Sequence, residues 1–170
     1  MEEQKMGETR LPERVLAGGL LYKKRIRAVA ICLFSHDGRI LVAEGTDALT
    51  GETFYRPLGG TIEFGERSRD TVIRETGEEL GAEVKPQSLR FLGTLENIFV
   101  YNGLPGHEIM LVYDGELADA TLYEQEELNA QEDDGVPFHA LWKPLSEFGP
   151  GAPLYPQGLL ELLAGQPHSG

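Results

Sequence analysis

Two glutamates, Glu78 and Glu79, follow a third, Glu75, by three and four residues. The pattern of residues 68–80 predicts a helix, in which each residue advances by about 100°. At positions i, i+3 and i+4 the three carboxylates therefore lie on one helix face, within reach of a common point. Like charges this close repel one another unless a cation lies among them. Oxygen ligands without Cys or His nearby favour Mg²⁺ or Mn²⁺ over zinc.

The residues around these glutamates have properties that a metal site needs. Arg74 precedes Glu78 by four residues, so it can hold a ligand carboxylate through charge-assisted hydrogen bonds. Gly59 and Gly60 let the backbone approach a ligand closely, and Gly81 predicts a left-handed residue that ends the helix. The opposite side of the helix is expected to pack on a sheet through an apolar stripe of Ile73, Thr76 and Leu80.

A Glu-rich helix is more often a solvated surface than a site, and Glu78-Glu79 alone would favour that interpretation. The register of the whole segment from residue 60 to residue 82 favours a site instead. It holds, in order, Gly60, Glu66, Arg74-Glu75, Glu78-Glu79 and Gly81. This skeleton resembles the box of the Nudix hydrolases, although Thr76 and Ala82 stand where that family has a larger aliphatic residue. The resemblance implies an α/β protein, an α/β/α sandwich with a central mixed β-sheet.

The resemblance also implies roles for individual residues. Members of the family hydrolyse a nucleoside diphosphate that is linked to another group. The metal ligands expected here are the carboxylates of Glu75, Glu78 and Glu79 and the backbone carbonyl of Gly59. Glu66 is expected to support this cluster from the start of the helix, and Arg74 to orient a ligand carboxylate.

The general base is left open, because the family recruits it from different places. Glu78 or Glu79 is one candidate. Glu108 is another, because the residues that follow it on the same strand face are apolar, and a carboxylate is costly to bury on such a face unless it has a role. The alternative is that Glu108 lies at a strand end and reaches solvent. Further candidates lie in an acidic segment, residues 116–134: Glu124, Glu126 and Glu127.

Substrate contacts are expected from Arg27 and Arg56, which begin or end strands near the glycine pair and could bind phosphate, although a single surface arginine usually has no such role. Tyr101 follows the box by 19 residues, a distance that resembles some dinucleoside polyphosphate hydrolases. Aromatic residues on strands are nevertheless more often part of the core. The downstream motifs of ADP-ribose and NADH hydrolases are missing, which disfavours those substrates.

These expectations give one main hypothesis and two alternatives. The main one is metal-dependent hydrolysis of the pyrophosphate linkage in nucleoside triphosphates, with oxidised ones such as 8-oxo-dGTP among the candidates. The first alternative is a dinucleoside polyphosphate hydrolase. The second is a Nudix module that senses a nucleotide without turnover, which the intact set of box carboxylates disfavours. A P-loop nucleotidase is excluded, because no Gly-x-x-x-x-Gly-Lys-Ser/Thr segment exists.

Composition limits the partners of this chain. The net charge of −13 disfavours a long nucleic acid, and with it a messenger RNA decapping role, but allows a small phosphorylated ligand. Cys32 is the only cysteine, so we expect it in the core and expect no internal disulfide. The longest apolar run is too short to cross a membrane, and no secretory leader is recognisable, so a cytoplasmic protein is expected. A homodimer is left open, because dimers are common in the family.

The 170 residues predict a flexible segment over residues 1–14 and one domain over residues 15–166. Within the domain, residues 15–22 could add a strand. Residues 35–38 and 102–106 predict the turns of two hairpins, and residues 116–134 a mobile acidic loop. A terminal helix is expected over residues 158–163. The other strands are expected at residues 28–34, 39–43, 53–56, 61–64, 89–101, 107–117 and 136–142.

Overall fold

We analysed a computed structural model, which describes residues 24–132 and 134–165. The flexible segment expected over residues 1–14 and the strand expected over residues 15–22 lie outside the described residues. The elements follow in the order β1 (Ile26–His36), β2 (Arg39–Thr46), β3 (Thr53–Arg56), β4 (Leu58–Thr61), α1 (Ser68–Leu80), η1 (Pro86–Ser88), β5 (Arg90–Tyr101), β6 (Leu104–Gly115), η2 (Ala120–Tyr123), β7 (Glu127–Gln131), β8 (Pro137–Pro144), η3 (Leu145–Glu147) and α2 (Leu159–Ala164).

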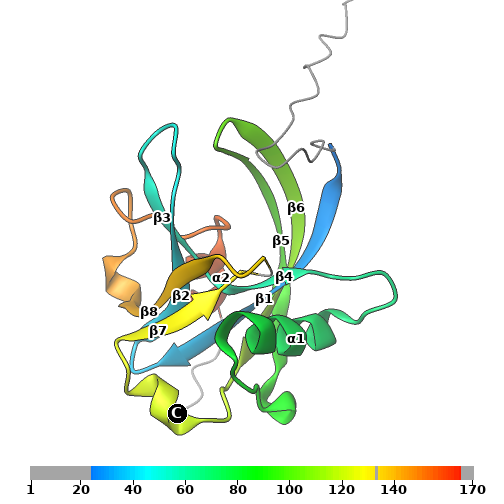
Figure 1. Cartoon of the computed structure of the whole chain (residues 1–170), viewed down its shortest axis with the longest axis vertical. Helices are drawn as coiled ribbons and strands as arrows, with labels where there is room; N and C mark the ends of the chain where they lie inside the picture. Colours follow the sequence, from blue (N-terminus) through cyan, green and yellow to red (C-terminus); the bar gives the residue numbers. More distant parts are fainter. Residues whose placement is uncertain (1–23, 133, 166–170) are drawn as a thin grey trace, which may run out of the picture.

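The strands form a mixed sheet with two wings that diverge from β1 and β2 (Figure 1). The first wing has the order β4-β1-β6-β5 and the second the order β3-β2-β8-β7. β1 and β6 are parallel, whereas the other neighbouring strands are antiparallel. The wings are joined where β1 pairs with β2, at the register Ser35↔Ile40 and His36↔Arg39. The expected mixed sheet is therefore confirmed.

The turn between β1 and β2 has the conformation that its sequence predicts. Asp37 and Gly38 have φ values of 48° and 71°, and two successive positive φ values suit a two-residue hairpin. The hairpin of β5 and β6 repeats this arrangement, with φ values of 49° at Asn102 and 75° at Gly103. Both expected hairpins are confirmed.

Two hydrophobic cores lie on opposite faces of the strands, because successive strand residues point to opposite sides. In β1, Ala30, Cys32 and Phe34 belong to the first core, whereas Val29, Ile31 and Leu33 belong to the second. α1 contributes Val72 to the first core, and α2 contributes Leu159 to the second. The helices thus cover the two faces of the sheet, as expected for an α/β/α sandwich. Cys32 is buried, as predicted.

The strand predicted at residues 61–64 is wrong. The strand in this region is β4, which begins at Leu58 and includes both residues of the glycine pair. Leu58, Gly59 and Gly60 pair with β1, because glycine permits the close approach of the two backbones there. Phe64 lies outside the strand and is fully exposed.

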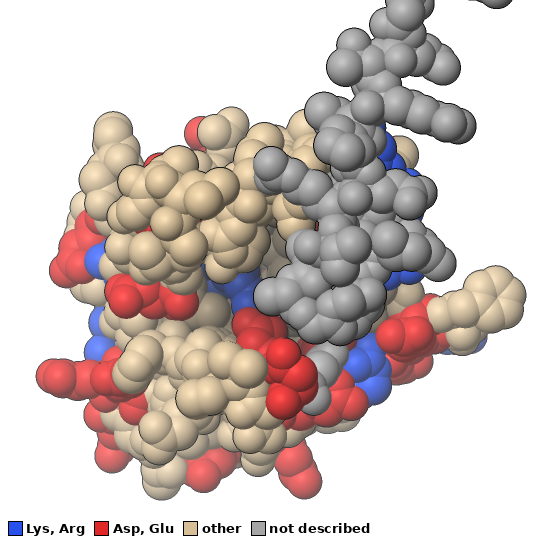
Figure 2. Space-filling view, turned by 45° about the horizontal axis from the view of Figure 1, so that its top comes forward, with Lys and Arg blue, Asp and Glu red and all other residues tan. Residues whose placement is uncertain are grey.

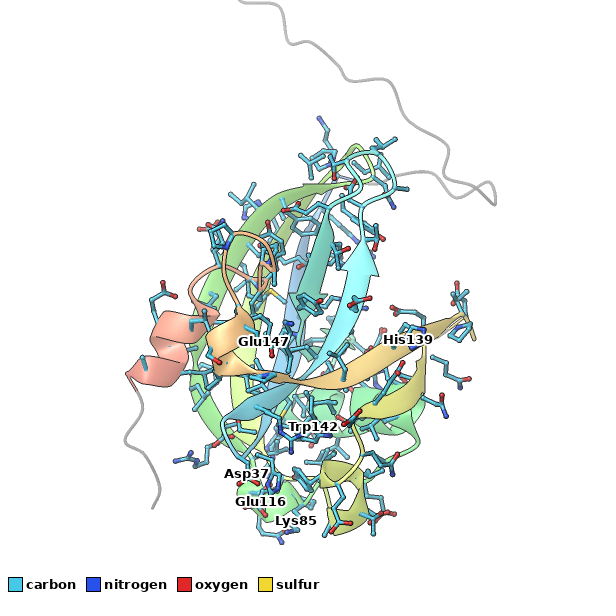
Figure 3. The ribbon with its side chains drawn as sticks, turned by 90° about the vertical axis from the view of Figure 1, so that its left-hand side faces the viewer. Asp37, Lys85, Glu116, His139, Trp142 and Glu147 are labelled. Carbon is cyan, nitrogen blue, oxygen red and sulfur yellow. The ribbon has the colours of Figure 1, made fainter. Side chains whose placement is uncertain are left out.

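The prediction of a mobile acidic loop over residues 116–134 is also wrong. This segment contains η2 and the strand β7, in which Leu128 and Ala130 alternate inward into the first core. The indole of Trp142, labelled on β8 in Figure 3, donates a hydrogen bond to the carbonyl of Leu122 at 2.9 Å. Alternate apolar residues therefore hold the segment in place despite its charge.

None of the helices in the described part of the chain is long and apolar enough to cross a membrane. At the end of the molecule where Figure 3 labels Lys85 and Glu116, these two side chains form an ion pair at 2.8 Å. The pair joins the segment before η1 to the residue after β6, and thereby fixes the connection that leaves α1.

Candidate active site on helix α1

α1 lies between the two wings and packs against β4, β1 and β7. It covers Ser68–Leu80, as predicted, and ends at Gly81, whose φ of 63° is left-handed. The amide of Gly81 donates to the carbonyl of Gly77 at 2.9 Å and closes the last turn. The box residues are therefore presented by a helix that lies between the two wings of the sheet.

The predicted packing stripe of α1 is only partly right. Thr76 is almost fully buried and Ile73 and Leu80 are half-buried, but Thr71 and Val72 are also buried and face the sheet. The hydroxyl of Thr76 donates to the carbonyl of Val72 at 2.8 Å, so this polar side chain is satisfied in the core.

The glycine pair of β4 lets α1 approach the sheet. A Cβ atom at Gly60 would overlap the carboxylate of Glu75, and one at Gly59 would overlap the backbone of Ala30. Gly59 also has a φ of 137°, which residues with a side chain rarely adopt. The two glycines therefore have separate roles: Gly59 permits the pairing of β4 with β1, and Gly60 makes room for the Glu75 side chain.

Arg74 connects three of the box glutamates. Its Nε and Nη2 atoms donate to the two carboxylate oxygens of Glu66 at 2.9 and 3.1 Å, a bidentate pair. Its Nη1 donates to Glu75 at 2.9 Å and to Glu78 at 2.8 Å. A further bond from Nη2 to the carbonyl of Thr61, at 3.1 Å, ties the guanidinium to β4. These hydrogen bonds are compatible with the expected orienting role of Arg74, which stays a prediction.

Glu66 is held as an anion at the start of the helix. The hydrogen bonds from Arg74 lower the pKa of Glu66 to about 2, with further contributions from the Thr71 hydroxyl and the amide of Glu63. These two groups donate to Glu66 at 2.7 and 3.1 Å. In return, the Glu66 carboxylate raises the pKa of Arg74. Glu66 therefore fixes the arginine that contacts the expected ligands.

Glu79 has the most perturbed environment among the box glutamates for which a shift is resolved. Its side chain is almost fully buried, and its Oε2 accepts a hydrogen bond from the amide of Gly59 at 3.2 Å. The pKa of Glu79 is raised to about 8, chiefly by burial and also by the charges of Glu132 and Glu75, although Arg56 and the Gly59 amide act in the opposite direction. A carboxyl that titrates near neutral pH can accept or donate a proton during a reaction.

Arg56 and Glu132 are brought to the same place from distant parts of the chain. Arg56 ends β3 and donates to Glu132, which follows β7, at 2.7 Å. The guanidinium lies over the ring of Phe138, 5.9 Å from its centroid. Arg56 is the one predicted phosphate contact that the structure places near Glu79. Glu132 was not predicted, because the acidic run around it resembled a solvated loop; the alternation of Leu128 and Ala130 was the signal that could have revealed the strand.

An open cavity of about 540 Å³ lies beside these groups. It is lined by Glu63, Arg74, Glu78, Gln131 and Glu132. Figure 2 shows many acidic side chains on one face of the molecule, with fewer basic ones between them. An anionic substrate at this cavity therefore needs cations to offset the acidic residues.

The donor set fits a hard divalent ion, although the side chains do not gather around one point. Within residues 24–132 and 134–165, no three His, Cys, Asp or Glu side chains form a ready metal cluster. Arg74 pairs with Glu75 and Glu78, while Glu79 bonds to the Gly59 amide. The three glutamates nevertheless lie at positions i, i+3 and i+4 of α1, Glu79 contacts Gly59 of β4, and all the candidate donors are oxygens.

The structure places Arg27, Glu108 and Tyr101 away from the box. Glu108 lies on the side of β6 that carries Met110 and Val112, both in the second core, on the face opposite α1. It is buried, forms an ion pair with Arg27 and accepts a hydrogen bond from Asn97 at 3.3 Å.

Tyr101 lies on the same side of the first wing as Asn97, the cross-strand partner of Glu108. Its ring meets that of Phe54 edge-on, with the centroids 5.6 Å apart. The acidic candidates after β6 are not brought to α1 either. Glu124 is exposed at the end of η2, and Glu127 pairs with His139.

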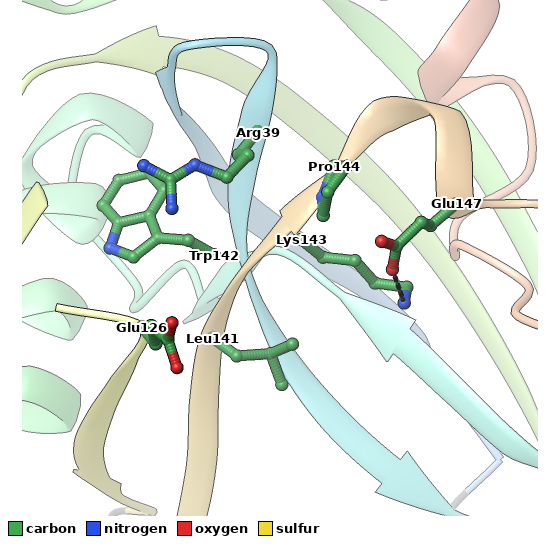
Figure 4. Close-up of a pocket in the computed structure, with 7 residues that line it drawn as sticks. All are labelled: Arg39, Glu126, Leu141, Trp142, Lys143, Pro144 and Glu147. Atoms are coloured by element: carbon green, nitrogen blue, oxygen red, sulfur yellow. Dashed lines mark hydrogen bonds and ion pairs between the residues drawn. The ribbon is translucent and has the colours of Figure 1, made fainter. Parts of the chain in front are cut away.

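Glu126 lines a separate cavity of about 360 Å³ along β8 (Figure 4). Its other lining residues are Arg39, Leu141, Trp142, Lys143, Pro144 and Glu147. Lys143 is held there by Glu147 at 2.9 Å and by the ring of Tyr55, 4.7 Å from the ammonium. None of the box residues lines this cavity, so we assign the candidate active site to α1.

Comparisons with known proteins agree with this geometry. The family model described as NUDIX domain matches residues 24–162. An RNA pyrophosphohydrolase from Gluconobacter oxydans (strain 621H) is 42% identical over 55 residues, which cover 32% of this chain and 31% of that protein. The match thus spans about a third of the curated relative.

Two solved structures share the fold. The crystal structure of a MutT NUDIX hydrolase from Burkholderia pseudomallei has a TM-score of 0.58 at 20% identity, covering 84% of this chain and all, 100%, of that one. A NUDIX hydrolase from Nitrosomonas europaea has a TM-score of 0.51 at 14% identity, covering 72% of this chain and 75% of that one. At these identities the likeness concerns the fold. With the family model matching most of its length, this chain belongs to the Nudix family.

Proposed function

We propose that this protein hydrolyses the pyrophosphate linkage of nucleoside triphosphates with the help of Mg²⁺ or Mn²⁺. The observation that carries the proposal is the pairing of Arg74 with Glu66, Glu75 and Glu78 next to the buried Glu79. A surface helix whose glutamates were only solvated would not bury Glu75 and Glu79 against a glycine pair. The buried carboxylates support a site rather than a solubilising face.

The carboxylates of Glu75, Glu78 and Glu79 and the carbonyl of Gly59 would hold the ion. A divalent ion there would neutralise phosphate charge and make a water molecule more acidic. Arg74 orients Glu75 and Glu78 and is itself oriented by Glu66. The proposed base is Glu79, whose buried carboxylate meets the amide of Gly59 beside the proposed ion and could take a proton from a water molecule there.

Arg56 is proposed to bind a substrate phosphate. Its guanidinium is already aligned by Glu132 and by the ring of Phe138, so little side-chain freedom is lost when a phosphate binds. Since Glu132 holds that guanidinium in the described structure, a phosphate must compete with or share this contact. Glu108 as base and Arg27 and Tyr101 as substrate contacts stay predictions, and their place on the opposite face favours Glu79 and Arg56 instead.

Several classes of substrate contain the pyrophosphate linkage that this site is proposed to hydrolyse. Oxidised nucleotides such as 8-oxo-dGTP and dinucleoside polyphosphates both contain the linkage. The Gluconobacter oxydans relative is named for RNA, which favours the 5′-triphosphate of a short RNA as a second candidate. The charge of −13 favours small nucleotides over a long nucleic acid. For the location of the protein in the cell, we propose the cytoplasm, where such nucleotides are found.

Product analysis tests the proposal. The chain is incubated with nucleoside triphosphates, 8-oxo-dGTP, a dinucleoside polyphosphate and a 5′-triphosphorylated oligonucleotide, with Mg²⁺, with Mn²⁺ or with chelator. Metal-dependent release of pyrophosphate and a monophosphate supports triphosphate hydrolysis, whereas two nucleotides from a dinucleoside substrate support the alternative. Nucleotide binding without any turnover would instead support a sensing module.

A further inference from the structure

The ion pair of Arg56 and Glu132 presents its negative partner to the cavity beside α1. Glu132 lines this cavity of about 540 Å³ together with Glu63, Glu78 and Arg74, whereas Arg56 is not among the described lining residues. The Nη2 atom of Arg56 donates to the Glu132 carboxylate at 2.7 Å. A polyphosphate that enters the cavity therefore meets the carboxylate of the pair before it meets the guanidinium.

The Glu132 carboxylate can leave Arg56 without a change in the fold. The side chains of Arg56 and Glu132 are 37% and 44% exposed, and ion pairs this accessible contribute little to stability. The backbone of Glu132 is held in place, because its amide donates to the carbonyl of Val136 and its carbonyl accepts from the amide of Gly135, both at 2.8 Å. Only the side chain of Glu132 has to move, and its exposed part can turn toward water.

Arg56 keeps one partner when Glu132 leaves. The guanidinium lies over the ring of Phe138, 5.9 Å from the ring centroid, and this contact uses none of the N–H donors of Arg56. A guanidinium can bind an anion through two parallel hydrogen bonds along either of two edges, and Nη2 belongs to both edges. A phosphate on either edge would lie beside the Glu132 carboxylate, so the two anions compete for Arg56.

We propose that Glu132 is a specificity-determining residue that lets a terminal phosphate reach Arg56 and excludes an internal one. A terminal phosphate carries a charge of about −1.5 to −2 at neutral pH, whereas a carboxylate, or a phosphate linked on both sides, carries a single negative charge. Because Coulomb attraction grows with charge, a terminal phosphate displaces the carboxylate from Arg56 and an internal phosphate does not.

This inference rests on the proposed function and narrows its substrate class. Nucleoside triphosphates and the 5′-triphosphate of a short RNA both end in a terminal phosphate. All the phosphates of a dinucleoside polyphosphate are internal, so the pair of Arg56 and Glu132 disfavours that class.

A purely aligning role of Glu132 would have the opposite consequence. If Glu132 only held Arg56 in place, its removal would weaken the binding of every phosphate. If Glu132 competes with the substrate, its removal strengthens the binding of a singly charged phosphate and changes that of a terminal phosphate much less.

Calorimetric binding of two non-hydrolysable ligands in Mg²⁺ tests the proposal. One is a nucleoside α,β-methylene triphosphate, and the other is its γ-methyl ester, in which the last phosphate is singly charged. We expect the parent chain to bind the triphosphate roughly tenfold or more tightly than the ester. Glu132→Gln should bind the ester about tenfold more tightly than the parent does, and the triphosphate within about threefold of the parent. Glu132→Ala should give the same change.

Two further variants show whether the preference depends on the ion pair. Glu161→Gln removes the same charge from α2 and should keep the preference of the parent chain. Arg56→Gln should lose the preference because its binding of the triphosphate is weakened. Weaker binding of both ligands by Glu132→Gln, an unchanged preference, or no binding of either ligand by the parent would overturn the proposal.

The binding measurement needs no turnover, so its result is separate from that of the product analysis. A parent chain that shows this preference but releases no pyrophosphate would support the role of Glu132 and contradict the proposed hydrolysis. A parent chain that hydrolyses triphosphates but binds the two ligands equally well would keep the proposed hydrolysis and overturn the role of Glu132.

Discussion

The carboxylate of Glu75 occupies the space that a side chain at Gly60 would fill. Because Gly60 has no Cβ atom, the Glu75 side chain of α1 can pack directly against β4 at this position. The two neighbouring glycines look equivalent in the sequence but differ in what a side chain would meet. At Gly59 a Cβ atom would overlap the backbone of β1, whereas at Gly60 it would overlap a side chain.

We predict different outcomes for alanine at the two glycines. Gly60→Ala should fold, because the Glu75 side chain can move, but it should bind Mn²⁺ at least tenfold more weakly. Gly59→Ala should lower the free energy of unfolding by about 2 kcal/mol or more, because it combines backbone overlap with a φ of 137°. Thermal unfolding and Mn²⁺ titration of both variants check this. Equal losses of stability would contradict the separate roles.

The stability of the metal-free protein should depend on Glu79. Its pKa is about 8 in the folded chain and near the ordinary value of 4.5 in the unfolded chain, so the folded state binds more protons between these values. The free energy of unfolding should therefore fall as the pH rises from about 4.5 to 8. Glu79→Gln should remove this dependence and be more stable than the parent at pH values above about 8. Denaturant unfolding over the pH range measures the difference, with Glu161→Gln on α2 as the control.

Metal binding should release a proton from Glu79 below pH 8, because the bound ion needs the carboxylate. The apparent affinity for Mg²⁺ should then rise up to about tenfold for each pH unit and level off above pH 8. Calorimetric titrations in buffers of different ionisation enthalpy count the protons. An affinity that stays constant from pH 6 to 8 would argue against Glu79 as a ligand.

Glu66 should protect the fold against acid. Its pKa of about 2 lies below the ordinary value of 4.5, so its contribution to stability is complete above pH 4.5 and is lost as the pH falls toward 2. Glu66→Gln should flatten this part of the profile, and Arg74→Lys should do the same because lysine cannot form the bidentate pair. Both variants should also lose turnover. Unfolding curves from pH 2 to 6 provide the check.

Arg56→Gln should raise KM by roughly tenfold, equivalent to about 1.4 kcal/mol, and change kcat less, because the proposed contact is to a phosphate away from the reacting water. Arg27→Gln is the matched control, since Arg27 pairs with Glu108 on the opposite face. Steady-state kinetics on one triphosphate separate the two parameters. A larger effect at Arg27 than at Arg56 would reverse the assignment.

The sequence predicted those parts of the fold that local rules control. The bounds of α1 followed from the box and from Gly81, and the first hairpin followed from Asp37 and Gly38. β4 was misplaced because a glycine pair is typical of a turn, whereas here the same lack of side chains allows two backbones to pair. The sequence could not predict which side of each strand faces α1, because that depends on how all the strands assemble into the sheet.

Within the site, the spacing of the glutamates predicted a shared helix face but not their hydrogen bonds. Glu132 was missed because its charge resembled that of a loop, and its place depends on the tertiary packing of Leu128 and Ala130. The position of Glu108 opposite the box could not be read from its own strand, since alternation gives two faces without saying which one α1 covers.

The central claim is that the glutamates of α1 form a metal-dependent hydrolytic site. Its most direct test is the rate of pyrophosphate release from a nucleoside triphosphate in Mg²⁺, compared between the parent chain, Glu79→Gln and Glu161→Gln. We predict chelator-sensitive turnover in the parent and the Glu161 variant, and a loss of at least a hundredfold in the Glu79 variant with its fold intact. Near-normal turnover of Glu79→Gln would contradict the claim.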